Sequence, residues 1–158
     1  MSKSIILYYS LQGNTKRVGE FLSQTLKLPI EQIRPVKDLQ SKGFSKYLVG
    51  GGQVMMKKKP EMMPIKANLD AYDTVLIGSP IWAGSFAPAI RTLLEDGQLK
   101  DKRVAFFYCH DGGPGKAKEK IKAGVSVHNE LISAYGLERV KDDFESLKQG
   151  LVRWAKEL

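Results

Sequence analysis

This chain of 158 residues has the length of one ordinary domain, and 42% of its residues are hydrophobic, which excludes global disorder. Its 25 Lys and Arg exceed its 17 Asp and Glu, and the formal net charge of +8 favours acidic partners or ligands. The one cysteine, Cys109, excludes an internal disulfide, and no apolar run reaches the roughly 18 residues of a membrane span. With no signal peptide in the pattern, we expect one cytoplasmic domain over residues 1–158.

The first half of the chain alternates between apolar strands and an amphipathic helix. Residues 4–10 form a nearly continuous apolar run, which is typical of a strand buried on both faces. Apolar residues at helical spacing over 18–26 predict a helix, and residues 30–36 alternate weakly as a second strand. Residues 37–68, rich in methionine, lysine, glycine and proline, predict a long surface segment with one short helix at most.

The second half repeats the alternation. Strands are predicted over 73–80 and 103–109, and a helix is expected from about Ser85 with Pro88 in its first turn. A helix is then predicted that ends at Gly136 and carries on one stripe Ile121, Val125, His128, Ile132 and Tyr135. A weak strand over 137–144 and a final helix with Ser146 as its N-cap follow. Five alternations predict a parallel α/β sheet with helices on both faces.

Three loops at strand ends carry the candidate chemistry. Parallel sheets bind ligands beyond the carboxyl ends of their strands, so loops 10–15, 79–84 and 109–115 should meet on one rim. The first leads into a helix, and the hydroxyls of Ser10 and Thr15, the Asn14 amide and the helix N–H groups suit one phosphate. It lacks the Lys-Ser/Thr ending of a Walker A loop, which disfavours a nucleoside triphosphate, and the Gly-x-Gly-x-x-Gly pattern, which disfavours a dinucleotide.

The other two loops offer a flat aromatic surface and an accessible backbone. Trp82 follows a strand end and Pro80, where an exposed indole can lie against a planar ring, although a lone tryptophan more often packs onto its own sheet. The third loop is rich in glycine, so a ligand can approach its backbone closely, and His110 or Asp111 can add a polar contact. Its alternative reading is an ordinary surface turn.

These motifs together resemble the flavodoxin family. The segment Tyr9-Ser10-Leu11-Gln12-Gly13-Asn14-Thr15 is similar to the family's phosphate loop, except that Gln12 replaces a hydroxyl residue. The segment Gly78-Ser79-Pro80-Ile81-Trp82-Ala83-Gly84 is similar to its Gly-x-Pro-x-Trp segment, and Gly112-Gly113-Pro114-Gly115 supports the match. The resemblance covers nearly the whole chain. It implies a three-layer flavodoxin-like sandwich, with a five-stranded parallel sheet in the order 2-1-3-4-5.

The resemblance also implies non-covalent FMN, with its phosphate in the first loop, its ring against Trp82 and its pyrimidine edge on the third loop. No metal is expected. The implied cofactor-binding residues are Ser10, Gln12, Gly13, Asn14, Thr15, Ser79, Pro80, Ile81, Trp82, Ala83, Gly84, Cys109, His110, Asp111, Gly112, Gly113 and Gly115. Ala83 stands where many flavodoxins have glycine, and a non-glycine residue at positive φ costs about 1 kcal/mol, which disfavours a stabilised semiquinone.

Three functions remain open at this point. The favoured one is an electron carrier that serves a redox partner protein, as a monomer or weak dimer. The second is an FMN-dependent reductase that takes hydride from NAD(P)H for a quinone or similar acceptor, favoured by the absence of a tyrosine that would cover the outer ring face. The third is a basic binding module without redox chemistry, but no nucleic-acid motif supports it and Lys116, Lys118, Lys120 and Lys122 are interpreted as a solvated helix surface.

The remaining reactive residues are given structural interpretations. Cys109 lacks the Cys-x5-Arg pattern of a cysteine phosphatase, so we interpret it as a small buried residue. His128 is expected on the apolar stripe of its helix, and the two histidines have no carboxylates at metal-ligand spacing. The methionine- and lysine-rich segment 50–64 is interpreted as packing of a long loop, and the alternative is that its methionines cover the flavin edge or form a docking surface.

Overall fold

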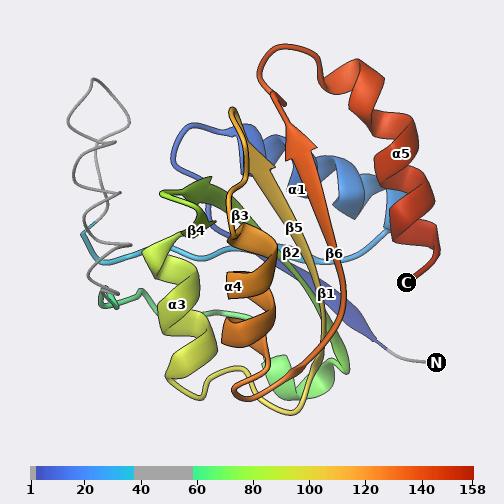
Figure 1. The fold of residues 1–158 in the computed structure, drawn as a ribbon. Coiled ribbons are helices and arrows are strands. Elements are labelled where there is room, and N and C mark those ends of the chain that lie inside the picture. Colours follow the sequence, from blue (N-terminus) through green and yellow to red (C-terminus); the bar gives the residue numbers. More distant parts are fainter. Residues whose placement is uncertain (1–2, 38–58) are drawn as a thin grey trace.

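The computed structural model describes residues 3–37 and 59–158. Six strands and five helical elements follow one another along this part of the chain (Figure 1). They are β1 (Ser4–Tyr8), α1 (Asn14–Leu26), β2 (Ile30–Gln32), η1 (Leu69–Ala71), β3 (Thr74–Trp82), β4 (Ser85–Phe86), α3 (Pro88–Glu95), β5 (Arg103–His110), α4 (Ala117–Val125), β6 (Glu130–Glu138) and α5 (Phe144–Lys156).

The strands form a parallel sheet in the order β2-β1-β3-β5-β6, with the short β4 paired antiparallel to β3. Without β4, this is the predicted five-strand order. Register places Tyr8 beside Gly78 and Pro80 beside Cys109. The carboxyl ends of β1, β3 and β5 are therefore neighbours, and the loops that follow them share one edge of the sheet.

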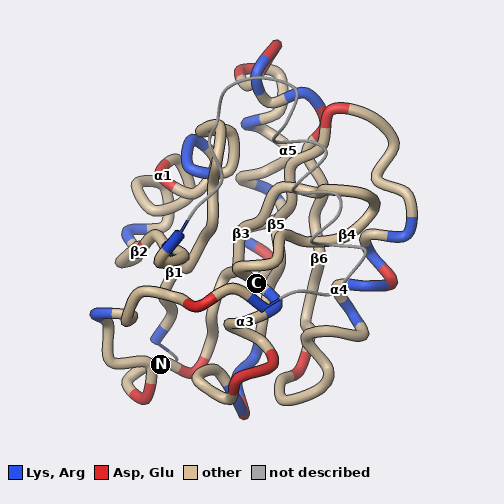
Figure 2. The backbone as a smooth tube through the Cα atoms, turned by 90° about the vertical axis from the view of Figure 1, so that its left-hand side faces the viewer, with Lys and Arg blue, Asp and Glu red and all other residues tan. Residues whose placement is uncertain are grey.

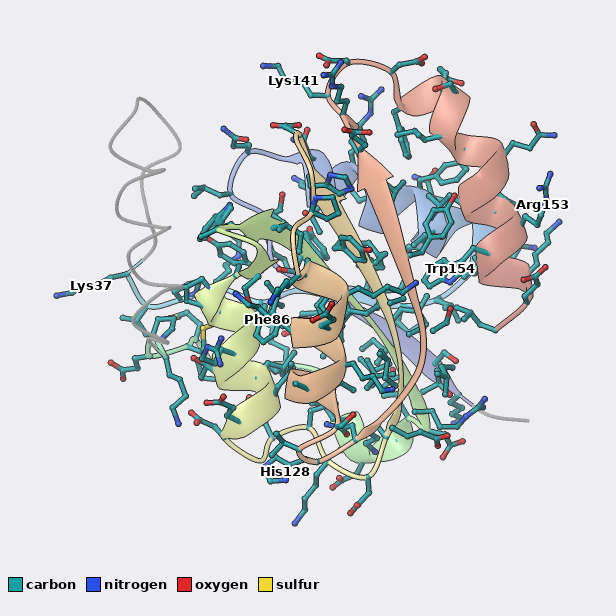
Figure 3. The ribbon with its side chains drawn as sticks, viewed as in Figure 1. Lys37, Phe86, His128, Lys141, Arg153 and Trp154 are labelled. Carbon is teal, nitrogen blue, oxygen red and sulfur yellow. The ribbon has the colours of Figure 1, made fainter. Side chains whose placement is uncertain are left out.

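Two apolar layers enclose the sheet because consecutive strand residues point to opposite faces. In β1, Ile5 and Leu7 pack toward α3 and α4, whereas Ile6 and Tyr8 pack toward α1 and α5. Phe86 belongs to the first layer and Trp154 to the second (Figure 3). In the described ranges, no helix is both long and apolar enough to cross a membrane.

The helix predicted from about Ser85 is wrong at its start. Ser85 and Phe86 form β4, a hairpin partner of β3, and the helix begins at Pro88, which occupies the first-turn position expected for it. The hairpin closes with two residues at positive φ, Ala83 at 50° and Gly84 at 73°, as a type I′ turn requires. Phe86 is buried on the sheet, so its burial keeps the chain extended until Pro88.

The helix predicted to carry Ile121 through Tyr135 is also wrong. It ends at Val125, and residues 130–138 are the edge strand β6. Asn129 stabilises the break, because its side chain accepts from Lys102 N at 3.0 Å and donates to Leu99 O at 2.9 Å. A bulge opposite Val104 and Ala105 lets the apolar residues of β6 keep a helix-like spacing in an extended strand.

Three smaller predictions change with these boundaries. His128 follows α4 as an exposed residue at the end of the sheet opposite Lys141, rather than on an apolar stripe (Figure 3). The strand predicted over 137–144 is only the tail of β6. The N-cap of α5 is Asp143, whose carboxylate accepts from Ser146 N at 3.2 Å, rather than Ser146 itself. Most of the segment 50–64 lies outside the described residues.

Candidate functional site

A cleft of about 500 Å³ opens at the carboxyl ends of β1, β3 and β5. This volume is within the range of small-molecule and cofactor sites. Its lining comes from the three loops singled out in the sequence: residues 10–12 with 14 and 15, residues 80–84, and residues 109–113. Stretches about 70 and 30 residues apart in the chain thus form one site, because the strand order places their ends together.

The first loop presents the amino terminus of α1 to the cleft. Ser10 Oγ accepts a hydrogen bond from Gly13 N at 3.1 Å, and Gly13 has φ of 101°, a conformation that favours glycine. Gly13 is the N-cap, no side chain caps the helix, and its first turn holds no acidic residue. The first N–H groups and the positive end of the helix dipole are therefore available to an anion.

Thr15 adds a buried hydroxyl to the same corner of the cleft. The residue is 1% exposed and lines the cleft, yet Oγ1 has no partner at full hydrogen-bond geometry. Its polar neighbour is the Cys109 thiol, whose pKa the hydroxyl lowers. An unsatisfied buried hydroxyl costs about 1–3 kcal/mol, so a ligand oxygen at this position would relieve that cost.

Cys109 lies in the floor of the cleft as a neutral thiol. Burial raises its pKa to about 12; the interaction with the Thr15 hydroxyl lowers the pKa in part, and the carboxylate of Asp111 adds a smaller increase. A thiol with such a pKa is almost fully protonated at neutral pH and is a poor nucleophile. The interpretation of Cys109 as a small buried residue rather than a catalyst agrees with this environment.

Trp82 forms an aromatic wall at the end of β3. It is half-buried, and its ring meets the buried ring of Tyr9 edge-on, with centroids 5.7 Å apart and planes at 87°. Both interpretations considered for Trp82 therefore hold in part: one side packs on the protein, and the residue still lines the cleft. The contact with Tyr9 restricts the indole, so a flat ligand would meet a surface that is already oriented.

The third loop is held by the imidazole of His110. His110 Nδ1 contacts the carbonyl oxygen of Gly112, and the ring stacks on Tyr108 with centroids 6.0 Å apart. Because a carbonyl oxygen only accepts, Nδ1 is the donor in this contact. Asp111 is the one aspartate, glutamate, lysine or arginine among the described residues of the lining. An anion here would be held by neutral donors.

All but three of the predicted site residues line the cleft. Gly13 belongs to the first loop but does not line the cleft. Ser79 is fully buried, where its Oγ accepts from Ala87 N at 2.9 Å and donates to Pro80 O at 2.8 Å. Gly115, at φ of 59°, packs against the Ala83–Gly84 turn: a Cβ on it would lie 3.5 Å from Gly84 Cα. The prediction missed Leu11, although its place inside the phosphate-loop motif was the signal that it faces the same space.

Comparison with known proteins agrees with this arrangement. The family model of the flavodoxin domain matches residues 56–141, which is more than half of the chain. That range includes β3, β5 and two of the three cleft loops. The first loop lies outside the matched range, so its assignment depends on the geometry described above.

Solved structures show the same fold over nearly the entire chain. A flavoprotein from Lactobacillus acidophilus NCFM, crystallised in complex with FMN, is 25% identical, with a TM-score of 0.75 over 95% of this chain and 99% of that one. Oxidised flavodoxin 2 from Bacillus cereus is 18% identical, with a TM-score of 0.62 over 98% and 95%. The two-electron reduced flavodoxin of Megasphaera elsdenii is 16% identical, with a TM-score of 0.60 over 98% and 99%.

Proposed function

Because this chain belongs to the flavodoxin-domain family, we propose that it binds FMN in the cleft at the strand ends and carries electrons to and from a redox partner protein. One observation supports this most directly. The cleft combines an uncapped helix amino terminus and an unsatisfied buried hydroxyl with a restricted aromatic wall. These features suit a ligand with a phosphate at one end and a flat ring at the other.

Each wall has a separate task in this proposal. The N–H groups of α1 and the Thr15 hydroxyl would hold the phosphate, and Ser10 keeps the loop in shape through Gly13. Trp82 would lie along the ring and exclude water from one side of it. The backbone of residues 110–113, fixed by the His110 contact with Gly112, would meet the polar edge of the ring. When bound, FMN would supply the capacity to accept and release one or two electrons.

Ala83 bears on how the site responds to reduction. It already has φ of 50° in the closed turn, so the strain expected of a non-glycine residue is present in the resting fold. The turn also abuts Gly115 on the third loop. Any rearrangement of the turn would therefore disturb a packed contact. This supports the expectation that the one-electron state is weakly stabilised.

A second candidate is an FMN-dependent NAD(P)H reductase acting on a quinone or similar acceptor. The observation that favours it is the composition of the lining, in which Trp82 is the one Phe, Tyr or Trp side chain among the described residues. The ring face away from Trp82 would then be reachable by a nicotinamide. The carrier remains our first proposal, since nothing in the three loops forms a dedicated dinucleotide site.

The first experiment is an absorption spectrum of the protein after incubation with FMN and desalting. Retained flavin bands with quenched fluorescence would support the proposal, and loss of all flavin would contradict it. Anaerobic addition of NADPH, compared with dithionite, would then separate the candidates, because only a reductase bleaches rapidly with NADPH. In the same assay, Trp82→Ala should weaken FMN binding by about 1–3 kcal/mol, by analogy with aromatic stacking on nucleobases.

A further inference from the structure

Four exposed lysines extend over helix α4 and the residue before it. Lys116 precedes the helix, and Lys118, Lys120 and Lys122 lie within it, with Glu119 as the one acidic residue of that stretch. The inward face holds Ala117, Ile121 and Val125, whereas the four lysines are exposed. Lys and Arg positions recur along the α4 backbone in Figure 2. Within the described part of the chain, none of the four ammonium groups pairs with a carboxylate.

The spacing of these lysines is unfavourable for an isolated helix. Lys116 and Lys120 are four residues apart, as are Lys118 and Lys122, so each pair shares a side of the helix. Like charges at this spacing repel and destabilise a helix. The fold gains nothing visible from this arrangement, but an external anionic surface would relieve the repulsion.

The lysines begin at the edge of the cleft. Residues 112 and 113 line the cleft a few positions before α4 begins. The hydrogen bond from Ala117 N to Pro114 O, at 3.1 Å, joins the first residue of α4 to this loop. A Cβ on the cleft residue Gly84 would lie 3.9 Å from Lys116 N. The helix rises about 1.5 Å per residue, so Lys122 is only about 9 Å farther along than Lys116, within about one Debye length at moderate salt.

We propose that the four lysines form the docking surface for an acidic protein that exchanges electrons with the cleft. The inference rests on the proposed electron-transfer function, because it places the partner beside the group that carries the electrons. Asp111, at the edge of the cleft, and Glu119 reduce the local charge, so the partner's carboxylates would be directed onto α4 rather than over the cleft opening. The net charge of +8 adds long-range attraction in the same sense.

A protein suits this surface better than nucleic acid. Single-stranded nucleic acids are held by aromatic side chains combined with a basic groove, and α4 contains no aromatic residue. Glu119 also lies among the lysines, where it would repel a continuous phosphate backbone but can be avoided by separate carboxylates.

The first test measures docking without reference to FMN. Fluorescein-labelled twelve-residue oligoglutamate would be titrated with the protein at about 0.02 M salt, and anisotropy recorded. K116Q/K120Q and K118Q/K122Q each remove one pair of charges while keeping helix-forming side chains. The matched control, K3Q/K100Q, removes two exposed charges that precede β1 and β5. Both lie at the amino-terminal ends of these strands, whereas the cleft lies at the carboxyl ends. Circular dichroism would verify the fold of each variant.

We expect each α4 double variant to bind oligoglutamate about fivefold more weakly, and the control to change binding less than twofold. The difference follows from distance, since the eight residues of β5 separate the control positions from the cleft edge by about 25 Å. Equal weakening in the control would overturn the proposal, because net charge alone would then explain binding. Tighter binding of single-stranded dT12 with the same dependence on α4 would overturn it in favour of nucleic acid.

The second test places the docking surface beside the electron path. The FMN-loaded protein, reduced by dithionite, would be mixed with ferricyanide, a trivalent anion. Two ferricyanide ions take one electron each from the two-electron reduced flavin, which returns to the oxidised form and releases its protons to solvent. With two charges about 10 Å from a trivalent ion, each α4 variant should slow the reaction about fivefold at 0.1 M ionic strength. Hexaammineruthenium(III), a trivalent cation, should react faster with them.

The outcomes separate this inference from the proposed function. A protein that retains no FMN but binds oligoglutamate through α4 would contradict the proposed function and leave the docking surface supported. A protein that holds FMN, with ferricyanide rates that are the same in the α4 and control variants, would overturn the docking surface and leave the proposed function intact.

Discussion

Replacing Thr15 by valine should make the ligand-free protein more stable and its FMN complex weaker. Valine keeps the shape and the β-branch of threonine, so the change removes little except the hydroxyl. That hydroxyl is buried, lines the cleft and lacks a partner at full geometry. The same group therefore destabilises the free protein and would bind the phosphate.

The magnitudes follow from the environment of the hydroxyl. An orphaned buried hydroxyl costs about 1–3 kcal/mol, and the interaction with the Cys109 thiol recovers part of this cost. We expect the free energy of unfolding of the ligand-free variant to rise by about 1 kcal/mol. A hydrogen bond to a charged group contributes about 1.5–3 kcal/mol, so FMN should bind roughly 10- to 150-fold more weakly.

Urea unfolding would measure the first effect and flavin fluorescence quenching the second. The chain offers a matched control in Thr74, whose Oγ1 is also buried without a partner but lies at the opposite end of β3. Thr74→Val should stabilise the protein by a similar amount and leave FMN affinity unchanged. Riboflavin, which lacks the phosphate, provides a second control, since Thr15→Val should leave its affinity unchanged.

Two results would refute this reasoning. If Thr15→Val weakened riboflavin and FMN binding equally, the hydroxyl would contact the ring or its side chain instead of the phosphate. If Thr15→Val and Thr74→Val had the same effect on FMN binding, the change would act through the whole fold.

Three further changes test the packing and the ionisation. Gly78→Ala should lower the free energy of unfolding by about 1–3 kcal/mol in urea, because the new Cβ would lie 2.3 Å from the buried ring of Phe107; an unchanged midpoint would contradict this. Asp143→Ala should cost about 1 kcal/mol by removing the cap of α5, and a larger loss in Ser146→Ala would show that the cap is wrongly assigned. The free energy of unfolding should fall as pH rises from about 9 to about 12, because the pKa of Cys109 is about 9 in the unfolded chain and about 12 in the folded one. Urea unfolding curves at pH 8 and 10.5 would measure this fall, and Cys109→Ala should lack the part of it that comes from the thiol.

Much of the site was predictable from local sequence because its parts lie on consecutive segments. Each of the three loops follows an apolar strand, and a parallel sheet must bring the carboxyl ends of neighbouring strands together. A short motif such as residues 10–15 carries its turn, its helix start and its hydroxyls in one stretch. The loops could therefore be assigned to one cleft before any contact was known.

Helix and strand in the second half were harder to distinguish. The apolar spacing from Ile121 to Tyr135 suits a helix, and nothing local to that segment shows that it ends at Val125. The decision comes from Asn129, which bonds to Lys102 and Leu99, and from pairing with β5. These partners are about 27 to 30 residues away, so hydrophobic periodicity does not reveal them.

The sequence by itself determined the alternating α/β order, the buried central strands and the three loops, because these depend on hydrophobic periodicity and turn residues within a few positions. Tertiary structure alone decided that Ser85 and Phe86 form a strand, that Ser79 turns its hydroxyl to Ala87 and away from the cleft, and that the Thr15 hydroxyl is buried without a full partner. Burial and hydrogen bonding depend on which distant segments meet, and that is settled only when the sheet and its helices pack together.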